Sequence, residues 1–164
     1  MIPAPILLMG GTGVIGRLTA RALCAVYPDV PLLIGGRDLA RSREAAGEIG
    51  QAEGVVIDPR AVDLGLGDRR VSAVAVFYAD ERLASLRFAQ NRNPLRTRNA
   101  VFHPNGAADL TALGVSMILE RLVGLDGSAP TPPGLYFPFQ VLDHPTYLSR
   151  LQAEGGSIVP LGAE

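Results

Sequence analysis

"LLMGGTGVIG", residues 7–16, places four glycines directly behind an apolar run. The segment PILLM (5–9) has the pattern of a strand buried on both faces, and residues 14–26 carry apolar side chains at helical spacing. Glycines between a strand and a helix allow a tight turn and leave the backbone open to a phosphate group. The N-terminus of the following helix favours an anion at the same place. The stretch therefore predicts a strand, a phosphate-binding turn and a helix.

The glycines match dinucleotide-binding turns in two registers. Gly10, Gly13 and Gly16 form G-x-x-G-x-x-G, while Gly11, Gly13 and Gly16 form G-x-G-x-x-G. Such a motif is weak alone, but here it follows a strand and opens a helix within a βαβ pattern. The alternative is a glycine-rich turn in an unrelated α/β protein. The predicted cofactor-binding residues of the turn are Gly10, Gly11, Thr12, Gly13, Val14, Ile15 and Gly16.

The end of the second strand indicates which dinucleotide binds. VPLLIGG (30–36) is followed by Arg37 and Asp38. An acidic residue near this position binds a ribose 2′-hydroxyl, whereas an arginine suits a 2′-phosphate. Asp38 is interpreted as a helix cap, so Arg37 favours NADP over NAD, with NAD still possible. Asp58, at the end of the third strand, is either a second cofactor contact near the adenine or an ordinary turn residue.

The pattern beyond the second strand continues the fold. A helix is expected over 39–49, capped by Asp38 and closed by Gly50, followed by strands at 54–58 and 71–78 and a helix after Asp80. This order predicts an α/β, Rossmann-like, doubly wound and mostly parallel sheet of strand order 3-2-1-4. Ligands of open α/β sheets bind at the carboxyl ends of the strands, so Tyr78 is a further predicted cofactor contact, near Asp80 and Glu81.

The remaining chain has a different pattern. We expect an NAD(P)-binding half over 1–90, a polar connector over 91–99 and a helical C-terminal segment over 100–164. One apolar helix is predicted over 110–123, capped by Asn105 and stopped by Gly124. A proline- and glycine-rich stretch, 125–134, cannot be regular structure. A last short helix is expected over 146–153, with Asp143 as its cap.

Composition excludes several classes of function. The 164 residues carry a net charge of −1, which favours neither nucleic acid nor an anionic membrane as a partner. No apolar run approaches the length of a membrane span and no signal peptide is visible, so a cytoplasmic location is expected. All fifteen basic residues are arginine, which excludes lysine Schiff bases and the Tyr-x-x-x-Lys pair of short-chain dehydrogenases. The single cysteine, Cys24, is interpreted as a buried thiol.

Four segments resemble the NAD(P)-binding domain and the C-terminal tail of saccharopine dehydrogenase-like proteins. They are MGGTGVIGRLTARAL (9–23), VPLLIGGRDLARSREAAGEIG (30–50), VSAVAVFYADERLASLRFAQ (71–90) and GLYFPFQVLDHPTYLSRLQAEGG (134–156). The resemblance implies a nucleotide-binding oxidoreductase that acts on carbon–nitrogen bonds of amino-acid-derived substrates. It places the cofactor at Gly10, Gly11, Gly13, Gly16 and Arg37. Proteins of that family insert a second domain and further strands where this chain has only the polar connector.

The sequence assigns no catalytic residue. His103 and His144 each precede a proline near a predicted helix start, a setting typical of solvated or capping residues. Tyr136 has no lysine to lower its pKa, and the arginines at 92, 96 and 98 suit a solvated loop. No group of His, Cys and acidic residues has metal-ligand spacing.

Three functions follow from these patterns. The first is an NADP-dependent oxidoreductase that transfers a hydride to or from an imine or carbonyl carbon of a small substrate. The second is a non-catalytic dinucleotide-binding module or sensor. The third, a short-chain-dehydrogenase-type epimerase or reductase, is disfavoured by the missing lysine.

A homodimer is expected from two unpartnered surfaces. The fourth strand, 71–78, would be an uncharged, apolar edge of the sheet, which invites association. Helix 110–123 is apolar around most of its circumference and needs a covering surface. Segments 100–103 and 157–159 are the alternatives that could add a strand to the exposed edge within one chain.

Overall fold

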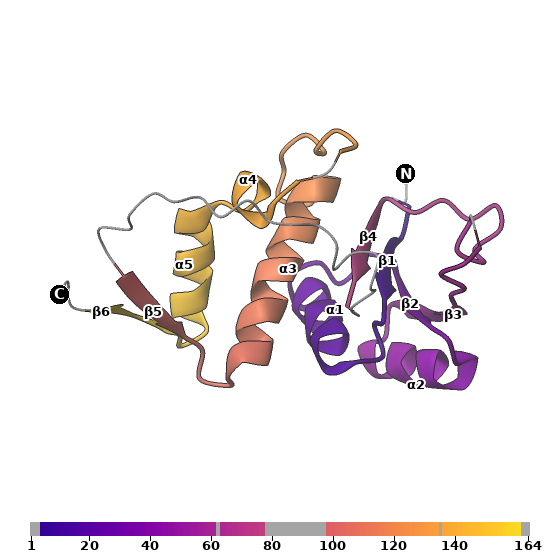
Figure 1. Cartoon of the computed structure of the whole chain (residues 1–164), viewed down its shortest axis with the longest axis horizontal. Coiled ribbons are helices and arrows are strands. Elements are labelled where there is room, and N and C mark those ends of the chain that lie inside the picture. The colour runs from indigo at the N-terminus through magenta and orange to yellow at the C-terminus, as the bar shows by residue number, and fades with distance from the viewer. Residues whose placement is uncertain (1–3, 62, 78–97, 135, 162–164) are drawn as a thin grey trace.

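The computed structural model describes residues 4–61, 63–77, 98–134 and 136–161. Figure 1 shows the sheet and the first two helices together in the N-terminal half of the chain. The helical C-terminal part extends away from them. The helix predicted after Asp80, and the residues Tyr78, Glu81, Arg92 and Arg96, lie outside the described residues.

The N-terminal half contains one parallel sheet. Its strands are β1 (Ile6–Met9), β2 (Leu32–Gly36), β3 (Ala52–Val56) and β4 (Ala73–Val76), in the order β3-β2-β1-β4. β1 lies between β2 and β4, and Met9 is level with Gly35 and Val76 at the carboxyl ends of the three strands. The predicted Rossmann-like fold and strand order are confirmed. β3 starts and ends two residues earlier than expected.

Alternating side chains of the strands enter two apolar clusters, one on each face of the sheet. Ile6, Leu8, Leu32 and Ile34 pack with Ala20 and Leu23 of helix α1 (Val14–Val26) and with Ala45 and Ala46 of helix α2 (Leu39–Ile49). On the other face, Leu7, Met9, Leu33, Val55 and Ile57 are covered by Leu64, Leu66 and Val71 of the segment between β3 and β4. The core therefore centres on β1 and β2, which are buried along almost their whole length.

The ends of α1 and α2 fall where the sequence places them. Asp38 caps α2, because its Oδ1 accepts the amides of Ala40 at 2.8 Å and Arg41 at 3.3 Å. Gly50 closes α2 at a φ of 92°, a conformation that favours glycine. Both helices begin at the carboxyl edge of the sheet and run back beside it, which brings their N-termini to the same edge.

Helix α3 (Ala107–Val123) is longer at its N-terminus than predicted. Its N-cap is Gly106, with a φ of 96° and no side-chain cap hydrogen bond, so the prediction of Asn105 as the cap is wrong. The left-handed Gly124 ends the helix as expected. α3 lies between α1 and helix α5 (His144–Ala153), with Leu119 in the sheet cluster and Leu113 and Met117 packed with Leu151 (Figure 1).

Asp143 caps α5 as predicted, accepting the amide of Thr146 at 3.1 Å. A one-turn helix, α4 (Pro138–Val141), precedes α5 and was not anticipated from the sequence. Its proline lies at one of the first two helical positions, where the missing amide proton costs no helical hydrogen bond.

The last two strands form a separate antiparallel pair. β5 (Arg98–Phe102) and β6 (Ser157–Leu161) align Phe102 with Ser157 and Ala100 with Val159. The two segments considered as additions to the parallel sheet therefore pair with each other instead. The first two residues of β5, 98 and 99, belong to the stretch that was expected to be a polar connector.

Across the parts of the chain that the structure describes, no helix is both long enough and apolar enough to cross a membrane.

Candidate functional site

The glycine turn leaves β1 through a fixed set of backbone hydrogen bonds. The amide of Gly10 donates to the Gly35 carbonyl oxygen at 2.8 Å, which ties the turn to the end of β2. The amide of Gly11 donates to Leu8 and that of Gly13 to Gly10, each at 3.0 Å. Gly10 has a φ of 78°, a backbone conformation that costs other residues free energy.

Two of the remaining glycines are required by packing. A Cβ atom on Gly11 would lie 2.8 Å from the Leu8 carbonyl oxygen, and one on Gly16 would lie 2.6 Å from the Gly11 Cα. These contacts are too short for any side chain. They bring α1 against the turn and β1, as a dinucleotide-binding turn requires.

Gly13 has no such requirement. Its φ of −79° and ψ of 172° are accessible to every residue, and a Cβ there would approach only the Gly10 carbonyl oxygen, at 3.4 Å. The protein's own packing therefore tolerates a side chain at this position. The absence of one leaves the N-terminus of α1 open to a group from outside.

The N-terminus of α1 provides free hydrogen-bond donors. Gly13 is the N-cap and makes no side-chain cap hydrogen bond, and the first amides, those of Val14 and Ile15, have no acceptor inside the helix. Val14, the first residue of the helix, is 69% exposed. Such an end attracts anions through its amides and its partial positive charge.

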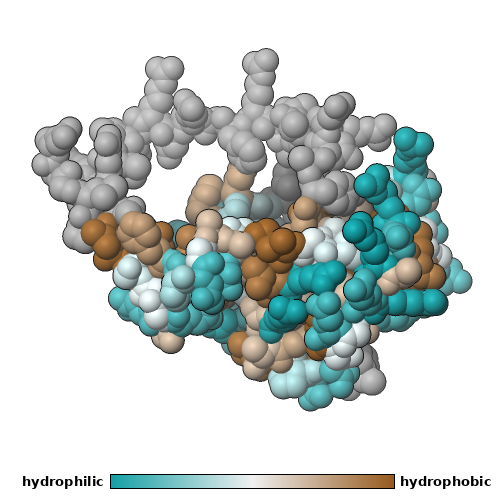
Figure 2. Space-filling view, turned by 90° about the horizontal axis from the view of Figure 1, so that it is seen from below, coloured by the Kyte–Doolittle hydropathy of each residue, from teal (hydrophilic) through white to brown (hydrophobic). Residues whose placement is uncertain are grey.

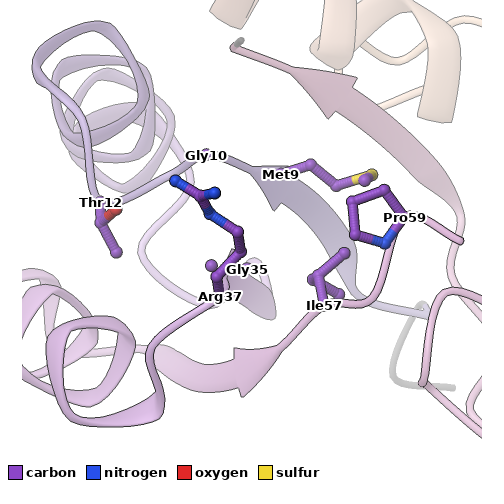
Figure 3. Close-up of a pocket in the computed structure, with 8 residues that line it drawn as sticks. Met9, Gly10, Thr12, Gly35, Arg37, Ile57 and Pro59 are labelled. Carbon is purple, nitrogen blue, oxygen red and sulfur yellow. The ribbon is translucent and has the colours of Figure 1, made fainter. Parts of the chain in front are cut away.

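A cavity of about 410 Å³ opens beside the turn, between the carboxyl ends of β1, β2 and β3 (Figure 3). Its lining residues are Met9, Gly10, Thr12, Gly35, Gly36, Arg37, Ile57 and Pro59. Most of this surface is apolar or bare backbone, as is usual for the flat ring of a ligand. The cavity lies at the strand edge where open α/β sheets bind their ligands.

Arg37 supplies the positive charge of the cavity. Figure 3 shows its guanidinium extending across the cavity toward Gly10 and Thr12. Among the described residues no carboxylate forms an ion pair with Arg37. The neighbouring Asp38 is occupied with the α2 amides, so its charge is directed at the helix. Within the described part of the chain, the cavity therefore presents a guanidinium without a carboxylate partner, which suits an anion.

The predicted site residues separate into groups. Gly10, Thr12 and Arg37 line the cavity, while Gly11, Gly13, Val14, Ile15 and Gly16 form the adjoining turn and helix start. Asp58 is exposed and its carboxylate accepts the Arg60 amide at 2.9 Å, so it holds its own turn and is not part of the cavity lining. Tyr78 lies outside the described residues. The other five lining residues were not predicted as cofactor contacts, and they lie at or near strand ends: Met9, Gly35, Gly36, Ile57 and Pro59.

The other candidate residues lie away from the cavity. His103 has a 3% exposed side chain, and its Nε2 is 3.2 Å from Glu154 Oε2, between β5 and α5. His144 begins α5, and the Tyr136 hydroxyl donates to the Pro132 carbonyl oxygen at 2.8 Å. Burial raises the pKa of the Cys24 thiol, which fits a structural residue. No group of potential metal ligands is present within the described residues.

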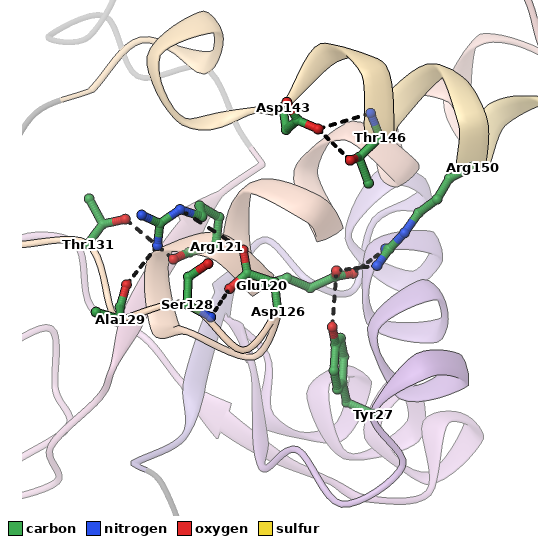
Figure 4. Close-up of polar contacts among 10 residues, drawn as sticks. All are labelled: Tyr27, Glu120, Arg121, Asp126, Ser128, Ala129, Thr131, Asp143, Thr146 and Arg150. Carbon is green, nitrogen blue, oxygen red and sulfur yellow. Dashed lines mark hydrogen bonds and ion pairs between the residues drawn. The ribbon is translucent and has the colours of Figure 1, made fainter.

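A second polar cluster joins the two parts of the chain (Figure 4). The Glu120 carboxylate, 3% exposed, accepts a hydrogen bond from Arg150 Nη1 at 2.8 Å and forms an ion pair with Arg150 Nη2 at 2.7 Å. The Tyr27 hydroxyl donates to the same carboxylate at 3.3 Å. Burial, followed by the Glu120 charge, raises the pKa of Tyr27. Tyr27 follows the C-terminus of α1, so this cluster lies at the opposite end of that helix from the glycine turn.

Comparisons with known proteins include a partial similarity to a solved structure. No family model and no curated protein matches the chain. Over 39% of its length the chain is similar to a solved structure titled "Crystal structure of a putative betaketoacyl-ACP reductase", with 32% sequence identity and a TM-score of 0.31. The match covers 27% of that chain, so this protein spans well under half of it. The fold described above therefore rests on the chain's own strand order and register.

Proposed function

We propose that this chain binds a dinucleotide and prefers NADP to NAD. The observation that carries the proposal is the Arg37 guanidinium, which forms no ion pair with a carboxylate of the described residues and extends over a cavity beside the glycine turn. In a dinucleotide the pyrophosphate and the 2′-phosphate lie on either side of one ribose. The turn and Arg37 offer an anion-binding group for each of them.

The residues present fit such a ligand. The amides of Val14 and Ile15 would bind the pyrophosphate, and the missing side chain at Gly13 would let it approach. Arg37 would bind the 2′-phosphate with two hydrogen bonds. Met9, Ile57 and Pro59 offer apolar surface for the adenine. Gly36 lines the cavity with bare backbone, and a Cβ atom there would lie 2.9 Å from Ser42 Oγ, so the packing against α2 also favours glycine.

We further propose that the bound cofactor serves an oxidoreductase. NADP, when bound, would supply or accept the hydride in a reaction at an imine or carbonyl carbon. The residues of this chain would bind and orient it. The resemblance to saccharopine dehydrogenase-like proteins over the N-terminal segments supports this step and suggests small, amino-acid-derived substrates.

The alternative is a non-catalytic dinucleotide-binding module. The positions of the histidines favour it, because His103 and His144 both lie in the C-terminal part, away from the cavity. Sustained oxidation of NADPH with a pool of imines and ketones would support the oxidoreductase. Tight binding of NADPH with no turnover on any of them would support the module.

Fluorescence titration with NADPH and NADH tests the binding proposal. Arg37→Gln should weaken NADPH binding by about 1.5–3 kcal/mol, the usual loss for a charge-assisted hydrogen bond, and leave NADH binding unchanged. Arg43→Gln, an exposed arginine of α2 outside the cavity, is the matched control and should bind both as the unmodified protein does. Equal affinity of the unmodified protein for NADPH and NADH would contradict the role of Arg37.

A further inference from the structure

The side chain of Arg17 connects α1, the glycine turn and α2. Its Nε donates a hydrogen bond to the carbonyl oxygen of Thr12 at 3.0 Å. Its Nη1 donates to both carboxylate oxygens of Glu48, at 2.8 and 3.0 Å. Glu48 also accepts a hydrogen bond from Arg21 at 3.1 Å. One guanidinium thus links the turn to the last part of the neighbouring helix.

These contacts fix the peptide between Thr12 and Gly13. In a trans peptide the carbonyl and the following amide point in opposite directions. Here the Thr12 carbonyl is held by Arg17, and the Gly13 amide donates to the Gly10 carbonyl oxygen at 3.0 Å. Rotation of this peptide would break both hydrogen bonds. The conformation of the turn is therefore set from outside the turn as well as within it.

Arg17 is not available as a ligand for the phosphates. Its charge is balanced by Glu48, and its Nη1 is directed at α2. The pair is partly exposed, with side-chain exposures of 30% and 38%, and ion pairs of this kind contribute little to the free energy of unfolding. We therefore expect the ion pair to matter for the conformation of the glycine turn more than for the stability of the fold.

We propose that Arg17 is a positioning residue, which Glu48 holds in place. By fixing the Thr12–Gly13 peptide, Arg17 keeps the amides of Val14 and Ile15 that follow it directed toward the pyrophosphate. The inference rests on the proposed dinucleotide binding. Because NADP and NAD share the pyrophosphate, a change in the turn should weaken the binding of both nucleotides to the same degree. Substitution of Arg37 should weaken the binding of NADPH alone. The effects on the two affinities therefore distinguish the role of Arg17 from that of Arg37.

Two variants test the proposal. Arg17→Lys keeps the charge and the pair with Glu48, but a single ammonium lacks the second nitrogen that reaches the Thr12 carbonyl. Glu48→Gln keeps the shape of the side chain and removes the charge that holds Arg17. The matched controls are Arg69→Lys and Glu53→Gln, from an exposed ion pair of 2.6 Å at the amino-terminal end of β3.

Dissociation constants for NADPH and NADH and the thermal midpoint are measured for all five proteins. We expect Arg17→Lys and Glu48→Gln to bind both nucleotides about three- to tenfold more weakly, as for one lost hydrogen bond. Their thermal midpoints should match those of the controls, whose affinities should be unchanged.

Three results would overturn the proposal. Unchanged affinity in both variants would show that the turn does not depend on Arg17. A loss confined to NADPH would make Arg17 a contact of the 2′-phosphate. A fall in thermal midpoint beyond that of the controls would make the pair merely structural. If the unmodified protein binds neither nucleotide, the proposed function itself fails, and this inference fails with it.

Discussion

The glycines of the turn differ in what each one is needed for. Gly11 and Gly16 are required by contacts below 3 Å inside the protein, whereas Gly13 is free of such contacts. A substitution at Gly13 therefore separates ligand binding from folding. This distinction cannot be read from the sequence, in which the three glycines belong to one motif.

Gly13→Val should abolish binding of NADPH and leave the fold intact, because the new side chain would occupy the approach to the α1 amides. Fluorescence titration and circular dichroism measure the two properties. Gly47→Val is the matched control, since a Cβ atom at Gly47 meets nothing within 4 Å. A Gly13→Val protein that binds NADPH with unchanged affinity would remove the main support for the proposed site.

Asp143 makes a pH-dependent contribution to stability. The hydroxyl of Thr146, followed by its amide, donates to the carboxylate and lowers the pKa of Asp143 below its ordinary value of 3.8. A lowered pKa means that the stabilisation is present above the ordinary value and is lost as the pH falls through the folded-state pKa. Asp143→Asn should be less stable at neutral pH, and the difference should shrink below pH 4. Denaturant unfolding at both pH values measures it, and a constant difference would contradict the assignment.

At the scale of elements, α3 is held between two different surfaces. Leu119 joins the sheet cluster, and Leu113 and Met117 pack with Leu151 of α5. The Glu120–Arg150–Tyr27 cluster crosses the same junction (Figure 4). The buried carboxylate therefore depends on partners from two other segments.

Arg150→Met should destabilise the protein by about 3–5 kcal/mol, because it leaves the Glu120 charge buried without its partner. The double variant Arg150→Met/Glu120→Leu should recover much of this loss, since it removes the charge as well. Chemical denaturation measures both. If the double variant is as unstable as the single one, the loss comes from packing and the charge argument is wrong.

The elements predicted well are those specified by local pattern. α1, α2 and the strand order follow from apolar spacing, the Asp38 cap and the glycines, all of which lie within short windows of sequence. The pairing of β5 with β6 joins segments more than fifty residues apart, and no local pattern indicates it. Of the cavity lining, the sequence predicted Gly10, Thr12 and Arg37, whereas Met9, Ile57 and Pro59 become neighbours of Arg37 only when three strands align.

At the scale of the molecule, the described residues leave apolar surface exposed. Val74 and Val76 of β4 are 42% and 43% exposed, although Leu7 and Met9, their register partners in β1, are buried. Figure 2 shows one face on which hydrophilic residues cover the region of α2 and hydrophobic residues gather in small groups. Helix α3 is largely covered by α1 and α5, so it offers little free surface to a second copy of the chain. We therefore expect the interface of the homodimer at β4.

We expect sedimentation velocity at micromolar concentration to show a dimer. Val74→Glu/Val76→Lys should shift it to a monomer, because charges on an edge strand oppose association. Ala73 and Ala75 face the α-helical side and would be left unchanged. A monomer in the unmodified protein would contradict the dimer.

The position of α3 also has a consequence for synthesis of the chain. Residues 6–76 build the parallel sheet, but Leu119, which completes the cluster around Leu8 and Leu23, is made more than forty residues later. A nascent chain that ends after β4 has all four strands and an uncovered face on α1. Long-range contacts of this kind form late and slowly. We therefore expect the growing chain to expose this apolar surface of α1 while the ribosome translates the second half.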